Sequence, residues 1–201
     1  MSEAFFIAVK TGDVETINAM LAADPSLASA TEDGVPALIL ALYHRQAESR
    51  YALLQGGAHV GPLEAAALGY VTDLDPSARG ADGFTALHLA AFFGGPDTVK
   101  ALLAAGADPD ADAENPLHVR PLHSAVASRD IDSVRALLEA GADPNVRQQG
   151  GYTPLHGAAH AGDAEMVELL LAHGADPAAE TDEGKDALAL ATGAAADALT
   201  P

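Results

Sequence analysis

The stretch DGFTALHLAAFFGGPDTVKALLAAGADPD, from Asp82 to Asp110, predicts two short helices between turn signals. Thr85 is suited to cap the first helix, and Gly106 is suited to end the second in a left-handed conformation. Leu87 and the alanines after it recur at helical spacing, which gives the helix one apolar face. One helix pair cannot bury that face alone, so the stretch is expected to recur along the chain.

The sequence contains further copies of this stretch. The nearest are RPLHSAVASRDIDSVRALLEAGADPN, from Arg120, and YTPLHGAAHAGDAEMVELLLAHGADP, from Tyr152. A shared histidine falls at His88, His123 and His156, which lie 35 and 33 residues apart, and the glycine ending the second helix repeats at the same intervals. Weaker copies begin at residues 5, 35, 62 and 184. Nearly the whole chain therefore belongs to one array.

The segment TPLHGAAHAGDAEMVELLLAHGAD, from Thr153, resembles the repeat of the ankyrin repeat family, and the resemblance covers roughly residues 4 to 195. It implies an all-α fold, a solenoid of helix-turn-helix units with hairpin-like loops. It also implies a non-catalytic protein-protein interaction module that binds a protein or peptide through its concave face. The alanine-rich, lysine-poor composition suggests a small bacterial ankyrin repeat-containing protein.

We expect a single domain over residues 1–201, made of consecutive repeats. The expected units are an N-terminal capping repeat (1–30), a degenerate repeat (31–60), a truncated repeat (61–80), three further repeats (81–112, 113–147 and 148–179) and a C-terminal capping repeat (180–201).

The regular spacing fails in the middle of the chain. The residues expected to end successive first helices, Arg45, Gly69 and Gly94, lie only 24 and 25 residues apart. No room remains for a hairpin after Gly57, and at most one turn of a second helix fits after Gly69. The truncation is either a harmless deletion that its neighbours cover or a notch that shapes a binding pocket.

The net charge limits the class of partner. The chain has 29 acidic and 10 basic side chains, a formal charge of −19, which repels a nucleic acid backbone or an anionic membrane. A basic protein or peptide is the better candidate, although the charge can also serve only to keep a stacked array in solution.

The absence of cysteine limits the possible chemistry, and the N-terminal sequence indicates where the protein is located. With no cysteine, the chain has no disulfide, catalytic thiol or cysteine-ligated zinc. The N-terminal sequence MSEAFFIAVKTGD has an acidic residue where a signal peptide is basic, and its apolar run is short, so we expect a cytoplasmic protein.

The histidines and acidic runs give no strong catalytic or metal motif. The resemblance implies that the histidines shared by the repeats are structural hydrogen-bonding groups between adjacent loops. His156 and His160 have a metal-compatible spacing, but Gly157 stands where the zinc-protease pattern has glutamate. An acidic run lacks the glycine and final glutamate of a calcium loop, and we expect a solvated loop or a contact with a basic partner at Asp108, Asp110, Asp112 and Glu114. No cofactor, metal site or catalytic residue is expected.

The resemblance places the ends of the first helices and the loop tips along the concave groove. The expected partner-binding residues at these positions are Tyr43, His44, Phe84, Phe92, Phe93, Val119, Tyr152 and His160. Clustered exposed aromatics are typical of a binding surface. We expect Phe93 to be the more exposed of the Phe-Phe pair and Phe92 to lean toward the truncated repeat, where either ring can instead fill the space of a missing helix.

The sequence is also compatible with two other functions. The chain can be a small-molecule-binding protein or an enzyme with a pocket beside the truncated repeat, lined by Tyr43, His44, Phe92, Phe93 and His160. An apolar groove can also pair with a second copy, although the sequence does not specifically indicate a homo-oligomer.

Overall fold

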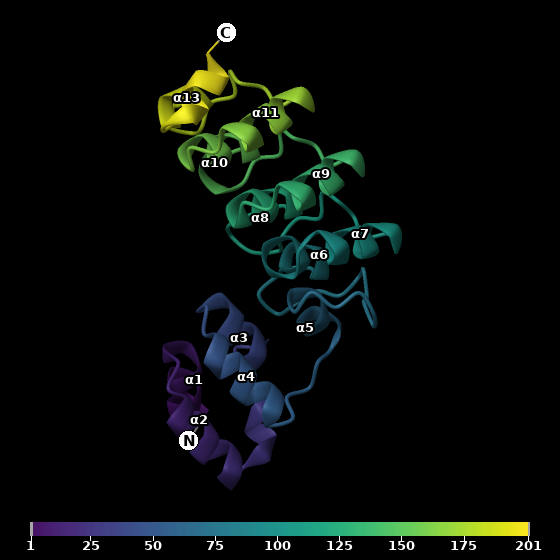
Figure 1. Cartoon of the computed structure of the whole chain (residues 1–201), viewed down its shortest axis with the longest axis vertical. Helices are drawn as coiled ribbons and strands as arrows, with labels where there is room; N and C mark the ends of the chain where they lie inside the picture. The colour runs from purple at the N-terminus through teal and green to yellow at the C-terminus, as the bar shows by residue number, and fades with distance from the viewer. Residues whose placement is uncertain (1, 201) are drawn as a thin grey trace.

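The computed structural model describes residues 2–200 and shows an elongated, curved stack of helix pairs (Figure 1). The inner row, on the concave side, consists of α1 (Ser2–Thr11), α3 (Ala37–Tyr43), α5 (Pro62–Ala67), α6 (Ala86–Leu89), α8 (Pro121–Ser128), α10 (Pro154–His160) and α12 (Ala187–Leu190). The outer row consists of α2 (Val14–Ala23), α4 (Ala47–Gln55), α7 (Pro96–Ala104), α9 (Ile131–Glu139), α11 (Ala164–Ala172) and α13 (Ala194–Leu199). The predicted all-α solenoid is confirmed.

Local side chains define the ends of these helices. The outer helices α2, α9 and α11 each begin at an aspartate whose carboxylate accepts a first-turn backbone N–H: Asp13, Asp130 and Asp163. The outer helices also end at glycines with left-handed backbone, Gly106 and Gly141 with φ of 93° and Gly174 with φ of 90°. A side chain at such a position would strain the backbone, and the predicted helix-ending role of these glycines is confirmed.

The loops between helix pairs are mostly irregular. One two-stranded hairpin, β1 (Thr31–Glu32) with β2 (Val35–Pro36), precedes α3, and the residues of its turn, 33 and 34, both have positive φ. The loop before α6 keeps a single antiparallel bridge between Arg79 and Thr85. Short 3-10 turns complete the loops, at η1 (Pro25–Ser29) and η3 (Gln149–Gly151).

The predicted truncated repeat consists of an inner helix without an outer one. After α5 the chain runs as a loop through residues 68–85 until α6 begins. Helix α5 also packs very closely on the next repeat. A Cβ on Gly94 would overlap the backbone carbonyl of Ala66, and one on Gly69 would lie 2.8 Å from the Gly94 carbonyl oxygen. Glycines therefore allow the two backbones to meet where a helix is missing.

The helix after the truncation is lengthened by one residue. Residues Ala90–Gly94 form a π-helical turn, η2, that continues α6, and the Gly95 N–H bonds the Ala90 carbonyl at 2.9 Å. The left-handed residue that ends this helix is Gly95, with φ of 82°, and the expectation that Gly94 ends it is wrong by one position. The other expected ends, including Arg45 and Gly69, do have positive φ.

The buried core is divided at the truncated repeat. One cluster is formed by α1 to α4, which we call the N-terminal block, and a second by α5 to α13. We call α6 to α13 the C-terminal block and residues 58–85 the junction. A small third cluster lies between them: Ile39, Leu42, Ala67 and Leu89. No helix within residues 2–200 combines the length and apolar character needed to cross a membrane.

Candidate functional site

Three histidines at one repeat position connect neighbouring loops. The Nδ1 atom of each accepts a backbone N–H from three residues earlier, at 3.2 Å for His88 and His123 and 3.1 Å for His156. Because Nδ1 accepts, Nε2 carries the proton and donates to a carbonyl of the next loop: Val119 at 2.9 Å, Tyr152 at 3.2 Å and Lys185 at 3.1 Å. The structural role expected for these histidines is confirmed.

Burial makes two of these imidazoles poor bases. It lowers the pKa of His88 and of His123 to about 4, and the carbonyl hydrogen bond of each opposes that shift only in part. Both rings are therefore neutral at pH 7, with both nitrogens in use. Among residues 2–200, no three histidine, aspartate or glutamate side chains gather closely enough to hold a metal ion.

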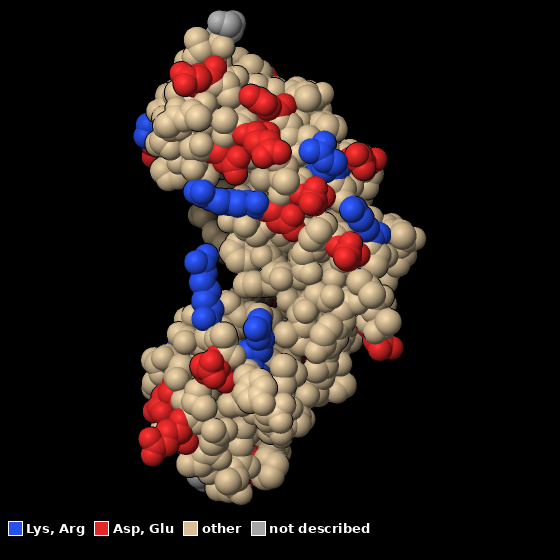
Figure 2. Space-filling view, viewed as in Figure 1, with Lys and Arg blue, Asp and Glu red and all other residues tan. Residues whose placement is uncertain are grey.

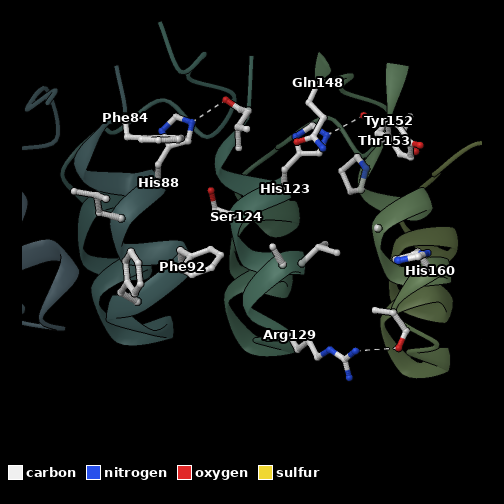
Figure 3. Close-up of a pocket in the computed structure, with 18 of the residues that line it drawn as sticks. Phe84, His88, Phe92, His123, Ser124, Arg129, Gln148, Tyr152, Thr153 and His160 are labelled. Carbon is white, nitrogen blue, oxygen red and sulfur yellow. Dashed lines mark hydrogen bonds between the residues drawn. The ribbon is translucent and has the colours of Figure 1, made fainter. Parts of the chain in front are cut away.

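A hollow of about 720 Å³ on the concave side lies in front of His88 and His123. Residues of α6, η2, α8 and α10 form its floor, and the loop tip that holds Tyr152 lies at its upper edge (Figure 3). The loop that holds Val119 also lines it. Aromatic rings dominate one end of it, and we call it the aromatic groove. Its principal side chains are Tyr43, Phe84, Phe92, Phe93, Arg129, Tyr152 and His160.

Four aromatic rings meet where the groove reaches the junction. The Tyr43 ring lies 6.5 Å from the Phe84 ring and 5.9 Å from the Phe93 ring, centroid to centroid, and Phe92 and Phe93 lie 4.6 Å apart. The Tyr43 hydroxyl donates to the Asp82 carboxylate at 2.5 Å. Burial, followed by this carboxylate, raises the pKa of Tyr43, so the hydroxyl stays protonated. This contact joins the N-terminal block to the junction.

Of the two phenylalanines, Phe93 rather than Phe92 packs toward the truncated repeat. Phe93 packs against the small cluster that bridges the blocks and against Tyr43, so it fills the space beside the truncated repeat. Phe92 is half-buried and lines the groove without belonging to a buried cluster. Both rings are half-buried and both line the groove, so the expectation that Phe93 is the more exposed ring stays a prediction. The π turn adds a residue to the helix after Ala90.

Most of the expected partner-binding residues come together in the aromatic groove. Residues of this set that line it are Tyr43, Phe84, Phe92, Phe93, Val119, Tyr152 and His160. His44 is exposed at the end of α3 and is not among the lining residues. The sequence reasoning missed Gln148, which the loop before Tyr152 brings to the rim, and Arg129, which ends α8.

A second hollow, of about 500 Å³, continues the aromatic groove toward the N-terminal block. The two hollows share Phe92, Phe93, Ala127 and Arg129. Arg45 and Arg50 approach from the other side, and none of the lining residues is acidic. We call this hollow the arginine notch. The sequence signal that could have predicted it is the presence of arginines at the ends of inner helices, where other repeats have glycine.

The acidic loop lies elsewhere and its carboxylates have partners within the chain. Asp112 pairs with Arg120 and, at 3.1 Å, with His118. The remaining carboxylates each accept a backbone N–H or face a cation: Asp108 from Asp110, Asp110 from Asp143, and Glu114 beside Arg79 at 3.5 Å. These contacts order the loop, and its contact with a partner stays a prediction.

Comparisons with known proteins agree with this architecture. A family model described as ankyrin repeats (3 copies) matches residues 64–148 and, in an overlapping match, 122–199. Among solved structures, the chain is similar to the ankyrin repeat domain of Bcl-3, described as a unique member of the IkappaB protein family. The two are 26% identical, with a TM-score of 0.63, over 97% of this chain and 96% of that one. The comparison with curated proteins gave no match.

Proposed function

The chain belongs to the ankyrin repeat family, and from that premise we propose that it binds a protein or peptide, without catalysis, through the aromatic groove. Ankyrin repeats are generally protein-protein interaction modules. The observation that carries the assignment to this face is the set of aromatic rings and loop tips around one open hollow of about 720 Å³. Clustered aromatics around a concavity are typical of the anchor positions that dominate binding energy.

The histidine bonds support this proposal because they hold the loop tips in place. Each loop that contributes to the upper edge is tied to the preceding inner helix by an imidazole. A preorganised rim lowers the entropy cost of binding. A bacterial source, a cytoplasmic location and the boundaries of the individual repeats stay predictions.

Site-specific crosslinking tests which face binds the partner. A photoreactive phenylalanine analogue at Phe92 lies in the aromatic groove, whereas the same analogue at Tyr51, 62% exposed on the outer helix α4, serves as the matched control. In a lysate of the native host, we expect position 92 to capture a specific protein that position 51 does not. Equal capture at both positions, or capture only at position 51, would contradict the assignment of the groove.

A small-molecule site is the second candidate, favoured by the groove volume alone. Hollows of about 300–1,000 Å³ are typical of drug-sized ligands, and this one falls in that range. His88 and His123, however, use both ring nitrogens in structural bonds, so neither is free as a general base. A metabolite library screened by thermal shift tests this candidate, with loss of the shift in Phe92→Ala as the criterion for the groove.

A further inference from the structure

We propose that the groove takes an acidic peptide segment, with an apolar side chain in the aromatic groove and carboxylates against the three arginines of the notch. This inference rests on the proposed function and specifies its partner. The net charge of the chain favoured a basic partner, but the local charge at the groove is the opposite.

Basic side chains without a carboxylate partner among the described residues gather at the arginine notch. Of the 10 lysines and arginines, Lys10, Arg79, Arg120, Arg147 and Lys185 lie within 4.0 Å of a carboxylate. The others have no such partner among residues 2–200: Arg45, Arg50, Lys100, Arg129 and Arg135. Three of these five line the arginine notch. Figure 2 shows basic side chains bordering the hollowed edge, with acidic ones gathered above and below it.

Two of these arginines have a left-handed backbone conformation. Arg45 and Arg129 end inner helices with φ of 55° and 60°, in the left-handed region where a residue with a Cβ is strained. Gly12, Gly69, Gly95 and Gly162 occupy the equivalent ends elsewhere in the array without that strain. Two repeats therefore place a long cation, at a conformational cost, where glycine folds more easily. Strain of this kind is characteristic of binding sites.

The guanidinium groups retain donors for a ligand. Arg129 uses one nitrogen to donate to the Ala161 carbonyl at 3.1 Å, and its other N–H groups stay available. The side chains of Arg45 and Arg50 make no hydrogen bond to other residues in the described range 2–200. The planar fork of arginine matches the two oxygens of a carboxylate, so aspartate and glutamate side chains are the fitting ligands.

The continuity of the two hollows explains why a peptide fits better than a small anion. Phe92 and Arg129 contribute to both, so a bound segment that fills the aromatic groove reaches the notch within a few residues. The overall charge of −19 repels such a segment at long range. At physiological salt, where the Debye length is about 8 Å, that repulsion is screened while contacts in the notch persist.

Three fluorescent peptides of equal length test the proposal at physiological salt by anisotropy. The sequences are Gly-Glu-Glu-Phe-Glu-Glu-Gly, the same peptide with lysine for every glutamate, and the same acidic peptide with serine for phenylalanine. We expect the acidic phenylalanine peptide to bind best, the serine peptide about tenfold more weakly, and the lysine peptide not measurably.

Substitutions then locate the binding. Arg45→Gly and Arg129→Gly relieve the backbone strain and so keep the fold, and each should weaken the acidic peptide about threefold, as for a partly exposed ion pair. Arg50→Gln should act similarly, and the triple variant should lose binding at least tenfold. Arg135→Gln changes the net charge equally on the exposed surface of α9 and is the matched control, expected to bind as the parent does.

The possible results distinguish failure of the acidic-peptide proposal from failure of the proposed peptide-binding function. If the lysine peptide binds best and Phe92→Ala removes that binding, the acidic partner is wrong while the peptide-binding groove stands. If the acidic peptide binds equally well to the triple arginine variant, the notch is not its site and the inference fails. If none of the three peptides binds at millimolar concentration and crosslinking at Phe92 captures no protein, both proposals fail together.

Discussion

The C-terminal and N-terminal blocks use the same repeat but are stabilised by different contacts. In the C-terminal block, His88, His123 and His156 connect successive loops through polar bonds. In the N-terminal block, Ile39 occupies the corresponding position and belongs to the small apolar cluster at the junction. Regular polar bonding gives a uniform stack, and its absence leaves the block joined mainly by side-chain packing.

The junction between the blocks is where the candidate site forms. In the truncated repeat, Glu64 takes the place of the histidine and accepts the Gly61 N–H at 3.0 Å, so this helix start is capped without a bond to the next loop. The missing outer helix lets Gly94 approach Ala66, and the rings beside it gather at the groove. The regular stack therefore provides rigidity, and the irregular repeat provides the hollow.

The two blocks should unfold separately when the core of only one of them is weakened. Leu53 in the N-terminal block and Leu137 in the C-terminal block are both fully buried, so alanine at either position should cost about 3 kcal/mol of unfolding free energy. Repeats contact mainly their neighbours, so each substitution should accelerate hydrogen exchange in its own block alone. We expect faster exchange in α1 to α4 for Leu53→Ala and in α8 to α11 for Leu137→Ala. Equal acceleration of both blocks in both variants would show one cooperative unit.

Acid should weaken the C-terminal block first. The folded pKa of His88 and His123 is about 4, below the usual unfolded value of about 6.5, so the unfolded chain binds more protons between these values. Stability is therefore fully present above pH 6.5 and falls as the pH drops toward 4, by about 1 kcal/mol per pH unit for each histidine.

Urea unfolding followed by NMR signals of each block, at pH 7 and pH 5, measures this difference. The two histidines together should cost the C-terminal block about 3 kcal/mol over that range, since both titrate in the unfolded chain between pH 6.5 and pH 5. His123→Asn, whose amide oxygen can accept the Arg120 N–H in place of Nδ1 but does not restore the bond to the Tyr152 carbonyl, should remove about half of the pH dependence. A parallel decline of both blocks, unchanged in His123→Asn, would assign the effect to other groups.

Gly94→Ala should destabilise the junction between the blocks. The added Cβ would overlap the Ala66 carbonyl, so the backbones of α5 and η2 must separate, at about 2 kcal/mol. Gly57→Ala is the control, because Gly57 has φ of 84° but no other residue within 4 Å of the place its Cβ would take, and it should cost only about 1 kcal/mol of backbone strain. Urea midpoints compare the two. Equal losses would mean that the close approach contributes nothing to stability.

The fold could be predicted from the sequence because its signals are local and repeated. Helix caps such as Asp130, glycines such as Gly106 and the shared histidines recur at one interval, so each copy supports the others. The truncation was visible as a shortened interval for the same reason. The π turn at Ala90–Gly94 was not, because it lies where the chain packs closely on α5 of the preceding repeat, which is a tertiary effect.

The candidate site could be predicted only in part. The aromatic groove follows from counting positions after the shared histidine. Which of Phe92 and Phe93 packs toward the truncated repeat does not, because the π turn adds one residue to this helix. The arginine notch joins Arg45 and Arg129, which are far apart in sequence and are brought together by the curvature of the solenoid around its truncated repeat. Total charge gave no indication of it, because a net value hides a local cluster of the opposite sign.

Tyr43→Phe is the smallest and most specific test of how the blocks are joined. The hydroxyl bonds the Asp82 carboxylate across the junction, and removing it should cost about 1 kcal/mol while leaving the ring packed against Phe93. Tyr51→Phe is the matched control, since that side chain is 62% exposed on an outer helix and should lose almost nothing. Urea unfolding gives both values. The loss in Tyr43→Phe should also vanish when Asp82 is changed to alanine, since the two groups form one interaction and a double-mutant cycle isolates it. If the loss persists in the Asp82→Ala background, the hydroxyl acts elsewhere, and packing of the rings alone holds the N-terminal block to the junction.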